Sequence, residues 1–144
     1  MTESAMVPPP IPFQASDELL DDGVHMLQTL LRIDTTNPPG NEDVAADQCA
    51  DWLKEVGIES EVHDAAPRRR SLKAVLGPDN EDTLILSAHL DVVPADASQW
   101  DHPPFSGSIH DGCIWGRGAI DMKHMAAYGL AIFRQLARDK ATMK

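Results

Sequence analysis

The amino-acid sequence predicts an α/β domain in which helices pack on a mixed, mostly parallel sheet. Helix-like and strand-like segments alternate along the 144 residues, which is the pattern of layered α/β domains. The strand candidate at residues 83–93 is also almost continuously apolar, as expected for a central strand covered by helices on both faces. We therefore expect one domain with this segment at the centre of its sheet.

Three segments have apolar residues at helical spacing. Ser16 is a suitable N-cap for the first helix, and the Asn-Pro-Pro-Gly segment at residues 37–40 ends it. The second helix is expected to open at Asn41 and to end near Gly57, and the third to cover residues 122–139.

The strand candidates lie between the second and third helices. Residues 58–63 alternate in polarity, residues 71–76 are mixed, and the apolar run at 83–93 follows. Residues 108–115 are typical of a hairpin, because Asp111-Gly112 suits a two-residue turn.

Composition divides the chain into a lead-in and one domain and excludes several classes of protein. Residues 1–15 are Pro-rich and are expected to form a flexible lead-in, followed by a domain at residues 16–144. The net charge of −11 argues against nucleic-acid binding, since phosphate recognition needs concentrated Lys and Arg. No apolar run approaches the ~20 residues of a membrane span. Two cysteines and the lack of a secretory signal lead us to expect a cytoplasmic protein.

His89 and Asp91 stand at the end of the predicted central strand. Because alternate strand residues point to one face, the two side chains should emerge together. The second ring N–H of a zinc-bound imidazole normally donates a hydrogen bond to a carboxylate, and Asp91 could accept that hydrogen bond. The alternative is an ordinary strand-end histidine beside a loop carboxylate.

Asp121 is the next candidate ligand. It follows the Gly116-x-Gly118 turn and stands at the start of the third helix. A carboxylate there could reach a metal held by His89 and bridge to a second ion, as in paired sites with metals ~3.5–4 Å apart. The alternative is a simple helix cap.

Four segments of the chain resemble one known family. LSAHLDVVP (residues 86–94) and WGRGAIDMK (115–123) resemble the two signature blocks of the cocatalytic zinc peptidases, which include aminoacylases, acetylornithine deacetylase, succinyl-diaminopimelate desuccinylase, dipeptidases and glutamate carboxypeptidases. LRIDTTNPPGNE (31–42) is similar to the opening motif of the family, and WDHPPFSG (100–107) to the segment between the blocks. The likeness extends from about Ser16 to the last residue.

The resemblance implies a zinc-exopeptidase-like fold and a set of roles. His89 and Asp121 would be metal ligands, with Asp121 bridging two zinc ions, for which cobalt or manganese could substitute. Asp91 would be the catalytic acid behind His89. The implied substrates are small peptides or N-acyl amino acids, and full-length members can form homodimers.

The resemblance also implies that residues 16–144 are the N-terminal portion of an incomplete catalytic domain. The general-base glutamate pair and the lid domain of the family would follow beyond Lys144. Our first hypothesis is therefore the front part of a metallo-hydrolase (peptidase or deacylase) acting on amide C–N bonds. The second is a non-catalytic remnant or interaction module with a partial metal site. The third is a mononuclear hydrolase that recruits acids such as Asp96.

The remaining polar motifs have simpler interpretations. His102 and His110 are expected to be solvated polar residues, and His124 to lie on a helix surface. The basic run at residues 68–70 is expected to mark an exposed loop. Gly116-x-Gly118 lacks the third glycine of a dinucleotide-binding fingerprint.

Overall fold

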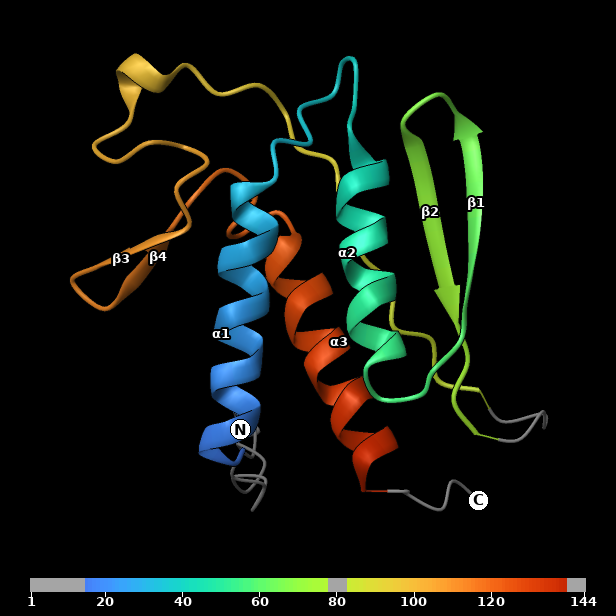
Figure 1. The fold of residues 1–144 in the computed structure, drawn as a ribbon. Helices are drawn as coiled ribbons and strands as arrows, with labels where there is room; N and C mark the ends of the chain where they lie inside the picture. The colour runs from blue at the N-terminus through green and yellow to red at the C-terminus, as the bar shows by residue number, and fades with distance from the viewer. Residues whose placement is uncertain (1–14, 78–82, 140–144) are drawn as a thin grey trace, which may run out of the picture.

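The computed structural model describes residues 15–77 and 83–139, and three helices form its centre (Figure 1). The helices are α1 (Asp17–Arg32), α2 (Glu42–Lys54) and α3 (Lys123–Arg138). Ser16 caps α1 as predicted, because its Oγ accepts a hydrogen bond from the Leu19 amide at 3.2 Å. Nearly all of the lead-in predicted for residues 1–15 lies outside the described residues.

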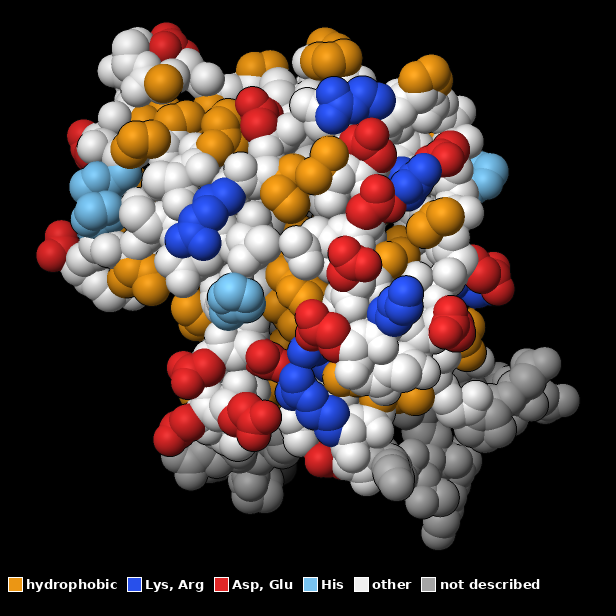
Figure 2. Space-filling view, in the orientation of Figure 1, with side chains coloured by type: hydrophobic (Ala, Val, Ile, Leu, Met, Phe, Trp, Pro, Cys, Tyr) orange, Lys and Arg blue, Asp and Glu red, His pale blue; other side chains and the backbone are white. Residues whose placement is uncertain are grey.

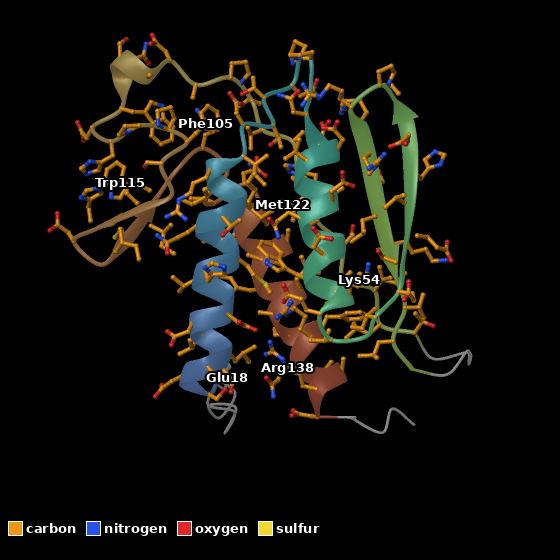
Figure 3. All side chains as sticks on the ribbon, viewed as in Figure 1. Glu18, Lys54, Phe105, Trp115, Met122 and Arg138 are labelled. Carbon is orange, nitrogen blue, oxygen red and sulfur yellow. The ribbon has the colours of Figure 1, made fainter. Side chains whose placement is uncertain are left out.

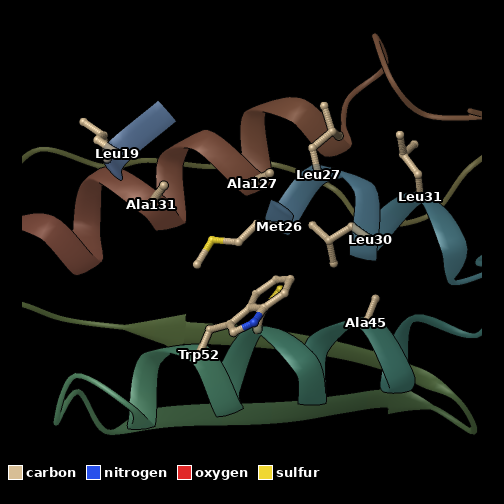
Figure 4. Close-up of a cluster of buried hydrophobic side chains, with 10 residues drawn as sticks. Leu19, Met26, Leu27, Leu30, Leu31, Ala45, Trp52, Ala127 and Ala131 are labelled. Atoms are coloured by element: carbon tan, nitrogen blue, oxygen red, sulfur yellow. The ribbon is translucent and has the colours of Figure 1, made fainter. Parts of the chain in front are cut away.

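The three helices enclose the hydrophobic core (Figure 4). Small residues on α3 let its backbone approach α1 closely, since Ala127 and Ala131 are almost completely buried. The buried side chains of the cluster come from all three helices: Leu19, Met26, Leu27, Leu30, Leu31, Ala45, Cys49, Trp52, Ala127 and Ala131.

A hairpin packs against α2 on the side away from α1 (Figure 1). It consists of β1 (Ser60–Ala66) and β2 (Arg69–Ala74), paired antiparallel with Ser60 opposite Ala74. The basic run at 68–70 is therefore not a free loop, because its three arginines bind acidic side chains of α2: Arg68–Asp43 (3.3 Å), Arg69–Glu42 (2.9 Å) and Arg70–Asp47 (2.6 Å). Figure 2 shows this intermingling of basic and acidic side chains on one face of the molecule.

A second hairpin lies beside α1 and is made of β3 (Ser108–His110) and β4 (Cys113–Trp115). Its turn residues Asp111 and Gly112 have φ values of 50° and 74°. Positive φ at both central positions is the requirement of a type I′ turn, so the predicted hairpin and its turn are confirmed. Between the two hairpins the described residues form one short 3-10 helix, η1 (Ala97–Gln99).

The α/β class is confirmed, but the predicted sheet is not present in the described ranges. These residues form two separate two-stranded antiparallel sheets, and parallel pairing occurs only at an isolated bridge between Thr36 and Val92. Residues 83–93 were predicted to be a buried central strand, yet apart from the bridge at Val92 they form no strand pairing. Leu84 and Ile85 are 86% and 78% exposed. A strand needs a neighbouring strand that pairs with its backbone N–H and C=O groups. The β1–β2 hairpin packs against α2 and does not pair with residues 83–93, so the prediction was wrong.

Two buried cations of α3 tie the helices together. Lys123 is fully buried, and its ammonium donates to the carbonyls of Leu30 (2.9 Å) and Ile33 (2.8 Å) at the end of α1. Burial lowers the pKa of Lys123 to about 8. Arg134 donates to the Trp52 carbonyl and to the Glu55 carboxylate (2.8 Å) at the end of α2. Each cation thus donates to carbonyls at the C-terminal end of a helix, where a positive charge is favoured.

None of the described helices is long and apolar enough to cross a membrane.

We predict that Lys123→Met destabilises the fold by about 1–3 kcal/mol. The change leaves the Leu30 and Ile33 carbonyls without their charged donor, and hydrogen bonds from charged groups contribute about 1.5–3 kcal/mol each. Part of that loss is offset because an ammonium no longer has to be desolvated. Urea unfolding measures the change, and Lys73→Met, at a lysine whose side chain is 68% exposed, is the matched control. Equal unfolding midpoints for both variants would contradict the interpretation.

We also predict that Gly23→Ala destabilises α1 although alanine is the better helix former. A Cβ at Gly23 would lie 2.5 Å from Cε1 of Tyr128 on α3. Overpacking costs about 1–3 kcal/mol, against about 1 kcal/mol gained in helix propensity, so we expect a net loss of about 1 kcal/mol. Thermal or urea unfolding tests this value. In a Tyr128→Ala background the same substitution should become stabilising, and a loss of equal size there would disprove the steric explanation.

Candidate metal centre

The loop after α1 fixes the position of the segment that carries His89 and Asp91. Thr35, which is fully buried, donates its hydroxyl to the Leu90 carbonyl at 2.6 Å. Its own carbonyl accepts the Val92 amide at 3.1 Å, and the Asn37 amide donates to the Val92 carbonyl at 2.9 Å. The backbone on both sides of Asp91 is therefore held by one short loop. This is the isolated parallel bridge of the fold.

Asp91 lies behind the His89 ring. Its Oδ1 is 3.2 Å from His89 Nδ1, and its backbone carbonyl is 3.0 Å from the same nitrogen. The side-chain amide of Asn37 donates to the other carboxylate oxygen at 3.0 Å and is the main cause that lowers the pKa of Asp91. An ionised Asp91 favours a proton on Nδ1, which leaves Nε2 as the nitrogen that can bind a metal.

Asp121 lies on the opposite side of the ring. Its Oδ1 is 3.1 Å from His89 Nε2, and its side chain is 87% exposed. Two ligand atoms that each bind a tetrahedral zinc ion at about 2.0–2.1 Å lie about 3.3 Å apart. The separation of these two donor atoms is therefore close to that of two ligands on one ion.

Gly118 explains how Asp121 reaches His89. Its φ of 93° favours glycine, and a Cβ there would lie 2.8 Å from Cγ1 of Val92. The turn before α3 can therefore pack directly on the segment that follows His89. Lys123, whose amide donates to the Gly118 carbonyl at 2.9 Å, anchors the same turn to α1. In Figure 3, Met122, between Asp121 and Lys123, lies at the upper end of α3.

The three candidate residues line a cavity of about 360 Å³. Its walls include the indole rings of Trp100 and Trp115. Trp115 belongs to the β3–β4 hairpin, beside α1 (Figure 3). Asp121, which lies 32 residues after His89, is thus brought together with His89 and Asp91 at one opening.

The donor atoms of this centre are of the kinds that bind zinc, but there are fewer of them than in a catalytic zinc site. Imidazole nitrogen and carboxylate oxygen are both zinc ligands, and catalytic zinc sites have three protein ligands. Within residues 15–77 and 83–139, no group of three His, Cys, Asp or Glu side chains is placed to hold one ion. The roles predicted for His89, Asp91 and Asp121 stay predictions.

Asp96 does not take the part of an additional ligand. Its Oδ1 accepts the amide and hydroxyl of Ser98 at 3.0 and 2.7 Å, so it caps η1. These hydrogen bonds lower its pKa. The mononuclear hypothesis that depended on Asp96 therefore has no support from the structure.

Sequence reasoning missed several residues around the cavity. Asn37 was interpreted only as part of a helix-ending turn, and nothing in its spacing connects it with Asp91. His102 and His110 were expected to be solvated, but their rings stack at 3.5 Å between centroids. His102 also meets the Trp115 ring edge at 4.7 Å. The two histidines therefore support Trp115 in the cavity wall.

Comparison with known proteins gives a consistent assignment. The model of Peptidase family M20/M25/M40 matches residues 85–144, which include all three candidate residues. A succinyl-diaminopimelate desuccinylase from Methylobacterium radiotolerans is 35% identical over 115 residues, covering 77% of this chain and 29% of the relative. An acetylornithine deacetylase from Vibrio atlanticus is 32% identical over 113 residues, covering 76% and 29%.

A solved structure has the same fold. The M20 family metallo-carboxypeptidase Sso-CP2 from Sulfolobus solfataricus superposes with a TM-score of 0.74 at 23% identity, covering 83% of this chain and 28% of that one. The chain spans less than a third of the length of each of these proteins. The family match and the relatives above 30% identity place the chain in peptidase family M20/M25/M40, and the fold agrees with this assignment.

Proposed function

We propose that the chain provides the His89–Asp91–Asp121 part of a zinc-dependent hydrolase of amide or peptide bonds in N-acyl amino acids or small peptides. The observation that carries the proposal is the placement of His89 between two carboxylates, Asp91 at Nδ1 and Asp121 at Nε2. One carboxylate orients the ring and the other faces its free nitrogen, as a metal ligand and its neighbour would.

The names of the relatives support this choice of reaction. They include a desuccinylase, a deacetylase and an N-formyl-4-amino-5-aminomethyl-2-methylpyrimidine deformylase from Halalkalibacterium halodurans, 33% identical over 112 residues. Each of these names describes removal of an acyl group. Both cysteines are free thiols, which agrees with the cytoplasmic location that we also propose.

In this proposal His89 Nε2 and Asp121 Oδ1 hold zinc, for which cobalt or manganese could substitute. A zinc ion there would act as a Lewis acid toward the amide carbonyl and would activate water. Asp91 keeps a proton on Nδ1 of His89, and Asn37 keeps Asp91 ionised and fixed in orientation. Of the described residues that line the cavity, only Asp91 and Asp121 are carboxylates, and both already face His89. The general base would therefore be a further carboxylate from outside this set.

A second candidate function is a non-catalytic interaction module. The observation that favours it is the exposed apolar segment around Leu84, Ile85 and Leu86. Exposed apolar surface of this kind is typical of sites that contact another polypeptide.

Zinc binding by the purified chain tests the proposal. We predict saturable zinc uptake in calorimetry that is lost in His89→Ala and in Asp121→Ala, since each removes one donor atom. Asp91→Asn should weaken binding by about 10–100-fold, the usual effect of losing the partner of a ligating histidine. His63→Ala, at an exposed histidine of β1, is the matched control and should bind normally.

The outcomes separate the two candidate functions. Release of acetate from N-acetyl amino acids by the zinc-loaded chain, absent in His89→Ala, supports the hydrolase. A chain that takes up no zinc, or takes it up equally well in His89→Ala, contradicts the proposed metal centre and favours the interaction module.

A further inference from the structure

His102 and His110 form a stacked pair that lies outside the candidate metal centre and takes no part in the proposed reaction. Their ring centroids are 3.5 Å apart and their planes differ by 6°. His102 belongs to the loop before the β3–β4 hairpin and His110 ends β3, so the stack joins this loop to the hairpin. The ring centroid of His102 also lies 4.7 Å from that of Trp115, with an angle of 83° between the planes. The stack therefore supports the part of the hairpin that lines the cavity.

Two serine hydroxyls can accommodate one positive charge on this stack. The Nε2 of His110 lies 3.0 Å from the hydroxyl oxygen of Ser108, which in turn lies 2.8 Å from that of Ser106. Because a hydroxyl both donates and accepts, Ser108 can accept a hydrogen bond from a protonated His110 ring and donate its own to Ser106. One imidazolium stacked on one neutral imidazole is thus compatible with all of these contacts.

A second positive charge on the stack would have no comparable partner. Two unit charges at this separation repel each other, and the repulsion is screened incompletely because both rings are half-buried. Within the described residues, the ion pairs between histidine and carboxylate belong to His89, and neither ring of the stack has one. The stacked arrangement therefore favours at most one charge.

The elements around the stack supply no buried negative charge that would offset this repulsion. From α1, the guanidinium of Arg32 donates to the Ser106 carbonyl at 3.2 Å and adds a further positive charge. From β4, the exposed thiol of Cys113 stands opposite His110 in the hairpin. Asp101 and Asp111, each next to one of the two histidines in the sequence, are exposed, so water screens their attraction.

We propose that the stack of His102 and His110 is a pH-sensitive support of Trp115. It holds the indole in the cavity wall while the pair carries at most one proton, and it releases the indole when both rings are protonated. Histidine side chains change their charge between about pH 5 and 8, so moderate acidification is sufficient. Two separated rings bind one proton more than the stacked pair, and a falling pH therefore favours the open arrangement. The two histidines are thus positioning residues of the cavity wall.

The test is a pH titration of the metal-free chain, in the presence of a chelator, from about pH 8 to about pH 5. Nuclear magnetic resonance of the indole N–H groups gives the readout, because Trp115 lines the cavity whereas Trp52 lies in the helical core. One additional bound proton changes an equilibrium by up to about tenfold per pH unit. We therefore expect the ratio of closed to open Trp115 to fall by at least about tenfold over this range. The Trp52 signal should stay in place.

Variants assign the transition to the stack. His110→Phe keeps an aromatic ring against His102 but leaves only one ring that can be protonated, so the transition should be lost. His110→Ala removes the stacking partner and should give the open Trp115 signal throughout the titration. His89→Ala removes the ring of the candidate metal centre, and His63→Phe alters an exposed histidine of β1; both should leave the transition unchanged.

Three results would overturn the inference. The first is a wild-type Trp115 signal that stays as constant as that of Trp52, or that moves together with it, and this measurement requires no variant to fold. The second is an undiminished transition in folded His110→Phe. The third is loss of the transition in His89→Ala, which would assign it to the candidate metal centre. The support requires neither zinc nor substrate, so failure of the zinc experiment would leave this transition measurable.

Discussion

The ammonium of Lys123 joins the core to the candidate metal centre. It is fully buried, and it donates to two carbonyls at the end of α1 while its own residue begins α3. The loop that follows α1 holds the backbone around Asp91, and Asp121 lies two residues before Lys123. The buried Lys123 ammonium therefore connects the loop that holds Asp91 and the turn that carries Asp121 to the same C-terminal end of α1. Its desolvation is offset by two charge-assisted hydrogen bonds to carbonyls at the C-terminal end of α1.

The site depends on a few short contacts at its margin more than on burial. The Asp121 side chain is largely exposed, so packing around the carboxylate cannot fix it. Its position follows from the close contact of Gly118 with Val92 and from the anchoring of Lys123. Asp91 is held differently, by the Asn37 amide on one oxygen and by the His89 ring on the other. The ring of His89 is therefore constrained from behind and open in front, which is the arrangement a metal ligand needs.

Local signals in the sequence predicted local structure well. The Ser16 cap and the Asp111-Gly112 turn are confirmed because each depends on residues within one or two positions of the feature. The central strand at 83–93 was wrong because apolar character shows a tendency to be buried but does not supply a strand neighbour. Arg134, near the end of α3, binds the end of α2, and nothing in the sequence around it indicates this partner. The partners of buried cations depend on how helices pack, and spacing along the chain does not encode that.

The extended segment at 83–93 has a consequence for how this polypeptide behaves at high concentration. An apolar run with free backbone groups is a template for pairing with an identical run in a second molecule. Here the run is interrupted at His89 and Asp91, where an ionised carboxylate opposes close stacking of copies. Beyond these residues the backbone of Val92 is already bonded to Thr35 and Asn37. The residues of the candidate centre thus also shorten the apolar edge with which a second molecule could pair.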